Sequence, residues 1–241
     1  MVHELVYSPN WFFGKDIIID IVAVIVLLLI GFVSIKNYSL LGKTNKKHLF
    51  FGISFVLIAI SIIAKITTNF TLYYHKYEIV QQIKNVIIVQ QTSQASMFLF
   101  LLGFLVYHMF MLWGLYGVFA TISNESKKSN IALAVFLIAV LTYFTNQLYY
   151  IFHLVSFFLI VLIIIRYQQN YLNNRNSSTK YLLIGFILLA ISQVAFIFEK
   201  LSSIIYVAAE IIQLIGFLML LITLLLVFKH GKKKKPYRHN K

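Results

Sequence analysis

Three ionisable side chains interrupt long apolar stretches of this sequence: Asp20, His153 and Glu210. A charged group inside a hydrophobic segment long enough to cross a bilayer costs about 2.5–3.5 kcal/mol on insertion scales, so it needs a partner, a proton or a function. Glu210 has only Ala and Ile beside it, and Gln213 lies one turn further along the same helical face. These residue types suit the binding of a polar ligand, or the transfer of a proton or a cation.

The apolar stretches themselves predict the fold class. Hydrophobic residues make up 60% of the 241 and charged residues only 12%, a balance far from that of a soluble domain. A helix of about 20 residues crosses about 30 Å of hydrocarbon. We therefore expect an all-α, polytopic seven-transmembrane-helix bundle over residues 1–229 and a basic tail over 230–241, with helices at 16–35, 49–66, 97–122, 131–144, 148–165, 181–198 and 204–228.

Counting along these helices places the polar side chains near one level. At 1.5 Å per residue, Asp20, His153 and Glu210 fall roughly 5–10 Å below the outer boundary, and Lys65 and Gln193 approach the same level. The inner halves contain almost nothing polar beyond Ser, Thr and Tyr. The pattern predicts an outward-facing polar pocket above an apolar plug, with a ligand-binding set of Asp20, Lys65, His108, His153, Gln193, Glu210 and Gln213.

Several of these side chains also have a purely structural interpretation. Lys65 lies close enough to a helix end to extend its ammonium to the headgroups. Asp16 and Asp20 lie at a helix N-terminus, where the helix dipole favours acids. His108, the deepest ionisable residue, could be a neutral, hydrogen-bonded core imidazole. Glu210 needs a counter-charge, for which Lys65 and Lys200 are the candidates.

Basic residues predict the orientation. All Lys and Arg except Lys15, Lys65, Lys76, Lys84 and Lys200 fall on one side of a seven-span arrangement. The positive-inside rule then places the N-terminus outside and the C-terminus in the cytoplasm, as in a multi-pass protein of the cell membrane. The polar turn within residues 145–147 separates the fourth and fifth helices. If residues 131–165 formed a single helix instead, the basic tail would be exported.

Composition also limits the partners and the chemistry. The tail lysines follow the last helix directly and suit anionic lipid headgroups, at about 1 kcal/mol each, rather than nucleic acid. The chain has no Cys, which removes disulfides and thiolate metal sites. A bis-histidine haem is disfavoured because His108 and His153 would differ in depth by roughly 12 Å. With no metal-ligand spacing and no nucleophile–base pair, we expect no metal, no cofactor and no enzyme.

Two features concern packing. Residues 67–96 form the longest outer segment, and their apolar spacing predicts a short amphipathic surface helix or an extension of the third helix. Gly103, Gly114 and Gly117 share one stripe of the third helix, where small residues let a neighbouring helix approach closely. Trp11 and the adjacent Tyr149 and Tyr150 are typical of outer-interface anchors.

An internal repeat is suggested by two similar segments. Residues 55–61, FVLIAIS, resemble residues 186–192, FILLAIS, and residues 25–30 are similar to 160–165. Helices one to three and five to seven would then be parallel copies joined by the fourth. This 3+1+3 layout resembles that of sugar-efflux (SWEET-type) transporters and, more loosely, of opsins and seven-helix receptors, and it resembles an uncharacterised prokaryotic seven-helix membrane protein family.

The resemblance is one of layout and not of motifs. No span contains Pro, so the proline–glutamine pairs of the sugar transporters are absent, and no Lys lies between Leu201 and Phe228 to hold retinal. The paired histidines of seven-helix hydrolases are also missing from the last helix. We expect a ligand-sensing or small-molecule-binding protein that signals to a separate cytoplasmic or membrane partner protein. The alternative is a small-solute transporter; an intramembrane enzyme and an assembly subunit remain further interpretations.

Overall fold

The computed structural model describes the backbone of residues 8–9, 11–12, 14–40, 46–82, 90–123, 128–145, 149–174 and 177–233. Within these, it describes the side chains of residues 8–9, 11–12, 14–39, 46–70, 101–123, 134–142, 150–173 and 179–226. The elements are α1 (Lys15–Leu40), α2 (Lys46–Gln82), α3 (Gln90–Ser123), α4 (Lys128–Thr145), α5 (Tyr149–Asn174), α6 (Ser177–Ile197), the short 3-10 helix η1 (Glu199–Leu201) and α7 (Ser203–Lys233).

The seven predicted helices are confirmed, and the protein is a polytopic membrane protein by helix length and hydropathy. Six stretches, within α1, α2, α3, α5, α6 and α7, are long and apolar enough to cross a bilayer. Large apolar side chains such as Phe32, Phe158 and Ile204 are exposed on their outer faces, which is the surface that lipid covers. The described side chains of α4 extend only over residues 134–142, so its crossing stays a prediction, as does the orientation of the termini.

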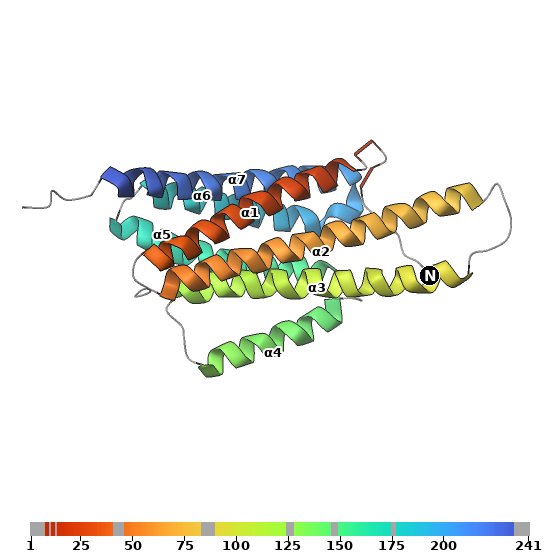
Figure 1. The fold of residues 1–241 in the computed structure, drawn as a ribbon, viewed down its shortest axis with the longest axis horizontal. Helices are drawn as coiled ribbons and strands as arrows, with labels where there is room; N and C mark the ends of the chain where they lie inside the picture. The colour runs from red at the N-terminus through yellow and green to blue at the C-terminus, as the bar shows by residue number, and fades with distance from the viewer. Residues whose placement is uncertain are drawn as a thin grey trace, which may run out of the picture.

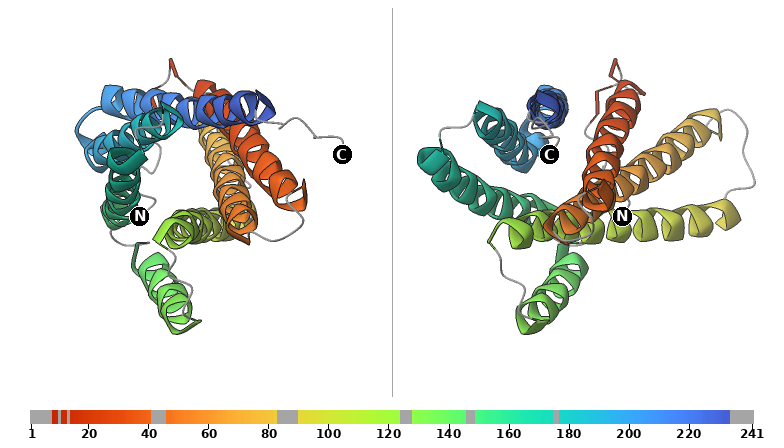
Figure 2. Two further views of the ribbon diagram at one scale, coloured as in Figure 1. Left: turned by 90° about the vertical axis from the view of Figure 1, so that its left-hand side faces the viewer. Right: turned by 60° about the vertical axis from the view of Figure 1, so that its left-hand side comes forward.

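Six helices form a closed ring around a common core. Among the described residues, contacts run from α1 through α2, α3, α5, α6 and α7 and back to α1, while α4 touches α3 and α5 and lies outside the ring (Figures 1 and 2). Successive helices run in opposite directions along the bundle (Figure 1). Four phenylalanines from four different helices are fully buried in the core, namely Phe55, Phe152, Phe186 and Phe217.

Close helix contacts occur where the sequence places glycine. A Cβ atom on Gly114 would lie 2.8 Å from the Ser54 carbonyl oxygen, and one on Gly117 would collide with the Ser54 hydroxyl. A Cβ on Gly103 would collide with the hydroxyl of Thr68. The predicted stripe on α3 is thus confirmed as a packing surface, and the neighbouring helix is α2.

The outer segment expected over residues 67–96 is helical for most of its length. Helix α2 continues without a break to Gln82, and α3 already begins at Gln90, which confirms the alternative of an extended third helix. No Gly or Pro follows Ile66 in α2, so nothing ends the helix where the apolar run ends. At 1.5 Å per residue, α2 is about 55 Å long and exceeds the hydrocarbon thickness by about 25 Å. Residues 83–89 lie outside the described chain.

The burial pattern supports one repeat alignment and corrects the other. Ser61 and Ser192 are both fully buried, and each hydroxyl donates to the carbonyl three residues earlier, at 2.7 Å and 2.8 Å. The alignment of Ile25 with Ile160 is wrong, because Ile25 is 53% exposed and Ile160 only 1%. Shifting it by two residues pairs buried Leu27 with Ile160. Because near-uniform aliphatic runs match one another in several registers, the amino-acid sequence alone does not select the register that pairs Leu27 with Ile160.

Candidate functional site: a buried ion cluster

Three charged side chains from three helices meet near one end of the bundle. The Lys65 ammonium on α2 lies 3.0 Å from Asp20 Oδ1 on α1 and 2.6 Å from Glu210 Oε1 on α7. The side chains of Asp20 and Glu210 are 3% and 1% exposed, and that of Lys65 is 14% exposed. Lys65 therefore does not extend to the headgroups; it points inward and joins α1 to α2 and α2 to α7.

The charges of this cluster do not balance. Two carboxylates share one ammonium, and the second oxygen of each, Asp20 Oδ2 and Glu210 Oε2, is buried with no hydrogen-bond partner among the described residues. Burying an ion costs several kcal/mol, about what a well-made pair recovers. An uncompensated carboxylate adds to that cost. Burying these charges therefore costs free energy of folding at one defined place in the bundle.

A second polar pair lies beside the first. His153 Nδ1 on α5 is 2.9 Å from Gln193 Oε1 on α6, so the imidazole donates from that nitrogen to the amide oxygen. The Phe196 ring stacks on His153, with centroids 5.0 Å apart and planes at 23°. The same ring lies 5.9 Å from the Lys65 ammonium. Phe196, which the sequence analysis did not select, thus connects the ion cluster to the His153–Gln193 pair.

His108 does not join the cluster among the described contacts. Its Nδ1 lies 2.7 Å from the carbonyl oxygen of Phe104, one turn earlier in α3, so the core interpretation of this residue fits. Its ring centroid lies 4.0 Å from that of Phe152, and the His153 centroid lies 4.9 Å from the same ring. The expected depth difference between the two histidines is therefore wrong. The depth of His108 was counted from residue 97, where the apolar run begins, whereas α3 already begins at Gln90.

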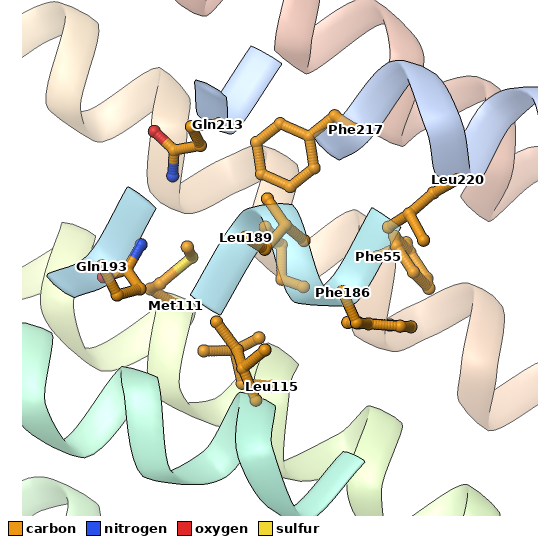
Figure 3. A pocket seen from close by; sticks show the side chains of 11 residues that line it. Phe55, Met111, Leu115, Phe186, Leu189, Gln193, Gln213, Phe217 and Leu220 are labelled. Carbon is orange, nitrogen blue, oxygen red and sulfur yellow. The ribbon is translucent and has the colours of Figure 1, made fainter. Parts of the chain in front are cut away.

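A small cavity lies at the centre of the ring that the six helices form. It has room for about one water molecule. Gln193 and Gln213 lie at one end, and the rest of the lining is apolar (Figure 3). The predicted apolar plug is present here, in Phe55, Phe186 and Phe217. Gln213 thus lines this cavity, and no described contact links it to the Lys65 ion pairs.

An aromatic cap, formed by Phe12 and its apolar neighbours, lies at the end of the bundle that holds the ion cluster. Phe12 is 5% exposed and packs in an apolar cluster with Phe196, Tyr206, Val207 and Ala209. A tight turn holds it there: the Phe12 amide donates to the Pro9 carbonyl, and Gly14 adopts φ of +79°, which favours glycine. Trp11 beside it is 60% exposed, consistent with an interface anchor. Asp20, His153, Gln193 and Glu210 are thus buried at 0–6% exposure, while the Lys65 side chain is 14% exposed, and the outward opening of the pocket stays a prediction.

If the predicted repeat is real, its two halves place interacting residues at equivalent positions. In the register set by the buried positions, Asp20 corresponds to His153, and Lys65 corresponds to Phe196. In the first half Asp20 forms an ion pair with Lys65 at 3.0 Å, and in the second half the His153 ring stacks on Phe196 with centroids 5.0 Å apart. On α3 and α7, the shared Gly114/Gly216 and Thr121/Thr223 spacing aligns His108 with Glu210. Under this alignment, the site would consist of corresponding positions that carry different chemistry in each half.

Comparison with known proteins adds no identity. No family model, no curated protein and no solved structure matches this chain. Within the described residues, no group of three His, Asp or Glu side chains is arranged to hold a metal ion. The function must therefore be argued from the buried cluster and its surroundings.

Proposed function

We propose that this protein is a ligand-binding, sensor-like membrane protein whose small polar ligand reaches the Asp20–Lys65–Glu210 cluster from the end capped by Phe12. The observation that supports this most is the enclosed lysine shared by two acids on different helices. A fold that needed only stability would be served at least as well by apolar residues there. A ligand that competes with Lys65 for these acids would loosen α7 from α2 and change the packing of the ring.

The surroundings of the cluster favour sensing over conduction. Phe55, Phe186 and Phe217 line the central cavity, which has room for about one water molecule, so a ligand bound at Lys65 would meet an apolar barrier there. Only short segments connect the helices at the opposite end. A signal would therefore pass to a separate partner protein in the cytoplasm or the membrane, and we assign the protein to binding rather than catalysis.

Transport of a small solute is the second candidate, and the internal correspondence of α1–α3 with α5–α7 favours it. Transporters built from two related halves place their site between the halves and expose it to each side in turn. The cavity fits such a position, since Phe55 and Phe186, which correspond in the repeat, both line it.

Cysteine accessibility tests the proposal, because the native chain contains no Cys. Gln193→Cys should react with a small, membrane-impermeant thiosulfonate added from the capped side. The reaction should be at least about tenfold faster when Phe12→Ala removes the cap. Leu189→Cys, one turn further along the same face of α6, is the matched control and should stay unreactive. If Gln193→Cys never reacts, with or without Phe12, no ligand path leads to the cluster and the proposal is wrong.

The same cysteine separates the two candidates. In sealed vesicles of known orientation, a sensor should expose Gln193→Cys to reagent from the capped side alone. A transporter should expose it from either side, since its halves alternate.

A further inference from the structure

The acidic residues of this chain are distributed in an unusual way. The chain has seven Asp and Glu residues against 21 Lys and Arg, and acids normally lie on the surface. The structure describes the side chains of four of the seven, and every one is buried: Asp16, Asp20, Glu199 and Glu210 are 0–5% exposed. All four lie at the same end of the bundle, where Lys65 pairs with Asp20 and Glu210. Negative charge is thus concentrated inside a strongly basic protein.

At the cluster itself, the two acids exceed Lys65 by one negative charge, and this excess can be assigned to particular atoms. Lys65 uses Asp20 Oδ1 and Glu210 Oε1, which leaves Asp20 Oδ2 and Glu210 Oε2 buried and unpartnered among the described residues. These residues are 2% and 0% exposed, so bulk water does not solvate the spare oxygens. A carboxylate pair in such surroundings can hold both charges only if another positive charge is present.

We propose that the spare carboxylate oxygens of Asp20 and Glu210 bind one additional positive charge, either a proton or a monovalent metal cation such as Na⁺. This deepens the proposed function, on which it rests, by naming the charge that the site exchanges. A bound charge neutralises the cluster and keeps α1, α2 and α7 joined through Lys65. Its release leaves a net negative site that repels anions and attracts a cationic ligand.

The other ionisable groups around the cluster define what must be controlled. Their side chains come from each neighbouring element: Asp16 on α1, Tyr107 on α3, His153 on α5, Glu199 on η1 and Tyr206 on α7, whose hydroxyl lies 3.5 Å from Asp16 Oδ2. None of them places a second full positive charge at the spare oxygens in the described contacts. Glu199, a buried acid outside the ion pairs with Lys65, offers a matched control.

Infrared difference spectroscopy tests the proton form on the full-length protein in lipid nanodiscs. At neutral pH and without Na⁺, the native protein should show the carbonyl stretch of a protonated carboxyl group, shifted by D₂O. Asp20→Asn or Glu210→Gln should remove this band, while Glu199→Gln should retain it. Because the native protein itself carries the band, the test does not depend on a variant that folds.

Thermal unfolding tests the metal form in the same nanodiscs, with NaCl compared against N-methylglucamine chloride at equal ionic strength. If Na⁺ is the bound charge, a hundredfold excess over its dissociation constant should raise the midpoint by about 5–10 °C. Glu210→Gln should abolish that rise, and Glu199→Gln should not. A native protein with neither a protonated carboxyl band nor a Na⁺-dependent midpoint would overturn this inference. The accessibility of Gln193→Cys does not depend on that result, so the proposed function can survive it.

Discussion

Lys65 is the residue on which the capped end of the bundle depends most. It is the described cation that contacts both buried acids, and it links α2 to α1 and to α7 through two bonds of 3.0 Å and 2.6 Å. Removing one member of a buried ion pair is more damaging than never having the pair, because the remaining charge stays buried. At Lys65 the effect is doubled, since two carboxylates would remain.

Lys65→Met should therefore destabilise the protein by about 3–5 kcal/mol, because Met fills similar space without a charge. The triple variant Lys65→Met/Asp20→Asn/Glu210→Gln removes every charge of the cluster and should recover most of the loss. Thermal unfolding in nanodiscs measures both. If Lys65→Met alone matches the native midpoint, the ion pairs do not hold these helices together.

The identities of the cluster residues could be predicted from sequence, but their pairing could not. A charged residue inside an apolar run is conspicuous, so Asp20, Glu210 and Lys65 could be chosen as candidate site residues from their positions along the predicted membrane helices. Which of Lys65 and Lys200 neutralises Glu210 depends on how helices rotate about their axes, and periodicity in a uniformly apolar helix does not fix that rotation. Phe12 was missed because an aromatic residue before the first helix is equally suited to lipid. Gly14, two residues further on, was the available signal for a turn that folds Phe12 inward.

At the scale of elements, glycines set how closely the helices pack. On α3, a Cβ at Gly114 would meet the Ser54 carbonyl oxygen at 2.8 Å, and that backbone atom cannot move independently. On α6, a Cβ at Gly185 would first meet the end of the Leu220 side chain at 2.8 Å, with the Gly216 carbonyl at 3.2 Å. Glycine therefore allows close packing in both helix pairs. The pairs differ in how near the neighbouring backbone oxygen lies to an added Cβ, at 2.8 Å for Gly114 and 3.2 Å for Gly185.

Gly114→Ala should destabilise the bundle by about 1–3 kcal/mol, since the added methyl group overpacks the α2–α3 interface. Gly185→Ala is its matched control and should cost clearly less, because Leu220 can change rotamer. Unfolding midpoints in nanodiscs give the comparison. Equal costs at the two sites would indicate that the α2 backbone gives way as readily as a leucine side chain.

Helix existence was predictable and helix ends were not. Hydropathy located all seven helices because the bilayer demands about 20 apolar residues per crossing. It placed the end of α2 at Ile66, however, whereas the helix continues to Gln82. Beyond the hydrocarbon boundary, polar residues are compatible with helix, and only a breaker or a cap would have marked the true end.

For the whole molecule, the ring has two seams between its halves, α1 with α7 and α3 with α5. The first seam contains the Tyr206–Asp16 contact and lies beside the Lys65–Glu210 pair, which joins α2 to α7, and the second contains the aromatic packing of His108 on Phe152. A polar seam opposite an aromatic one means that a change of charge acts on one side of the ring. The halves would then separate at α1/α7 and pivot at α3/α5.

The orientation of this ring in the membrane is open to a direct measurement. Single cysteines near Lys76 and Lys200 should react with impermeant thiol reagents on intact cells, and cysteines near Lys43, Lys127 or Lys233 should react only after permeabilisation. This follows from the positive-inside rule applied to seven crossings. Labelling near Lys233 in intact cells would overturn the seven-crossing assignment.

The uninterrupted length of α2 gives the protein a mechanical lever. Lys65 sits on the same rigid helix as Gln82, 17 residues or about 25 Å further along. If α2 pivots near Lys65 by about 10°, its far end sweeps about 4 Å, a displacement that a molecule docked on the projecting helix could impose or detect. Force applied outside the bilayer and charge exchanged at Lys65 would then act on one and the same rod.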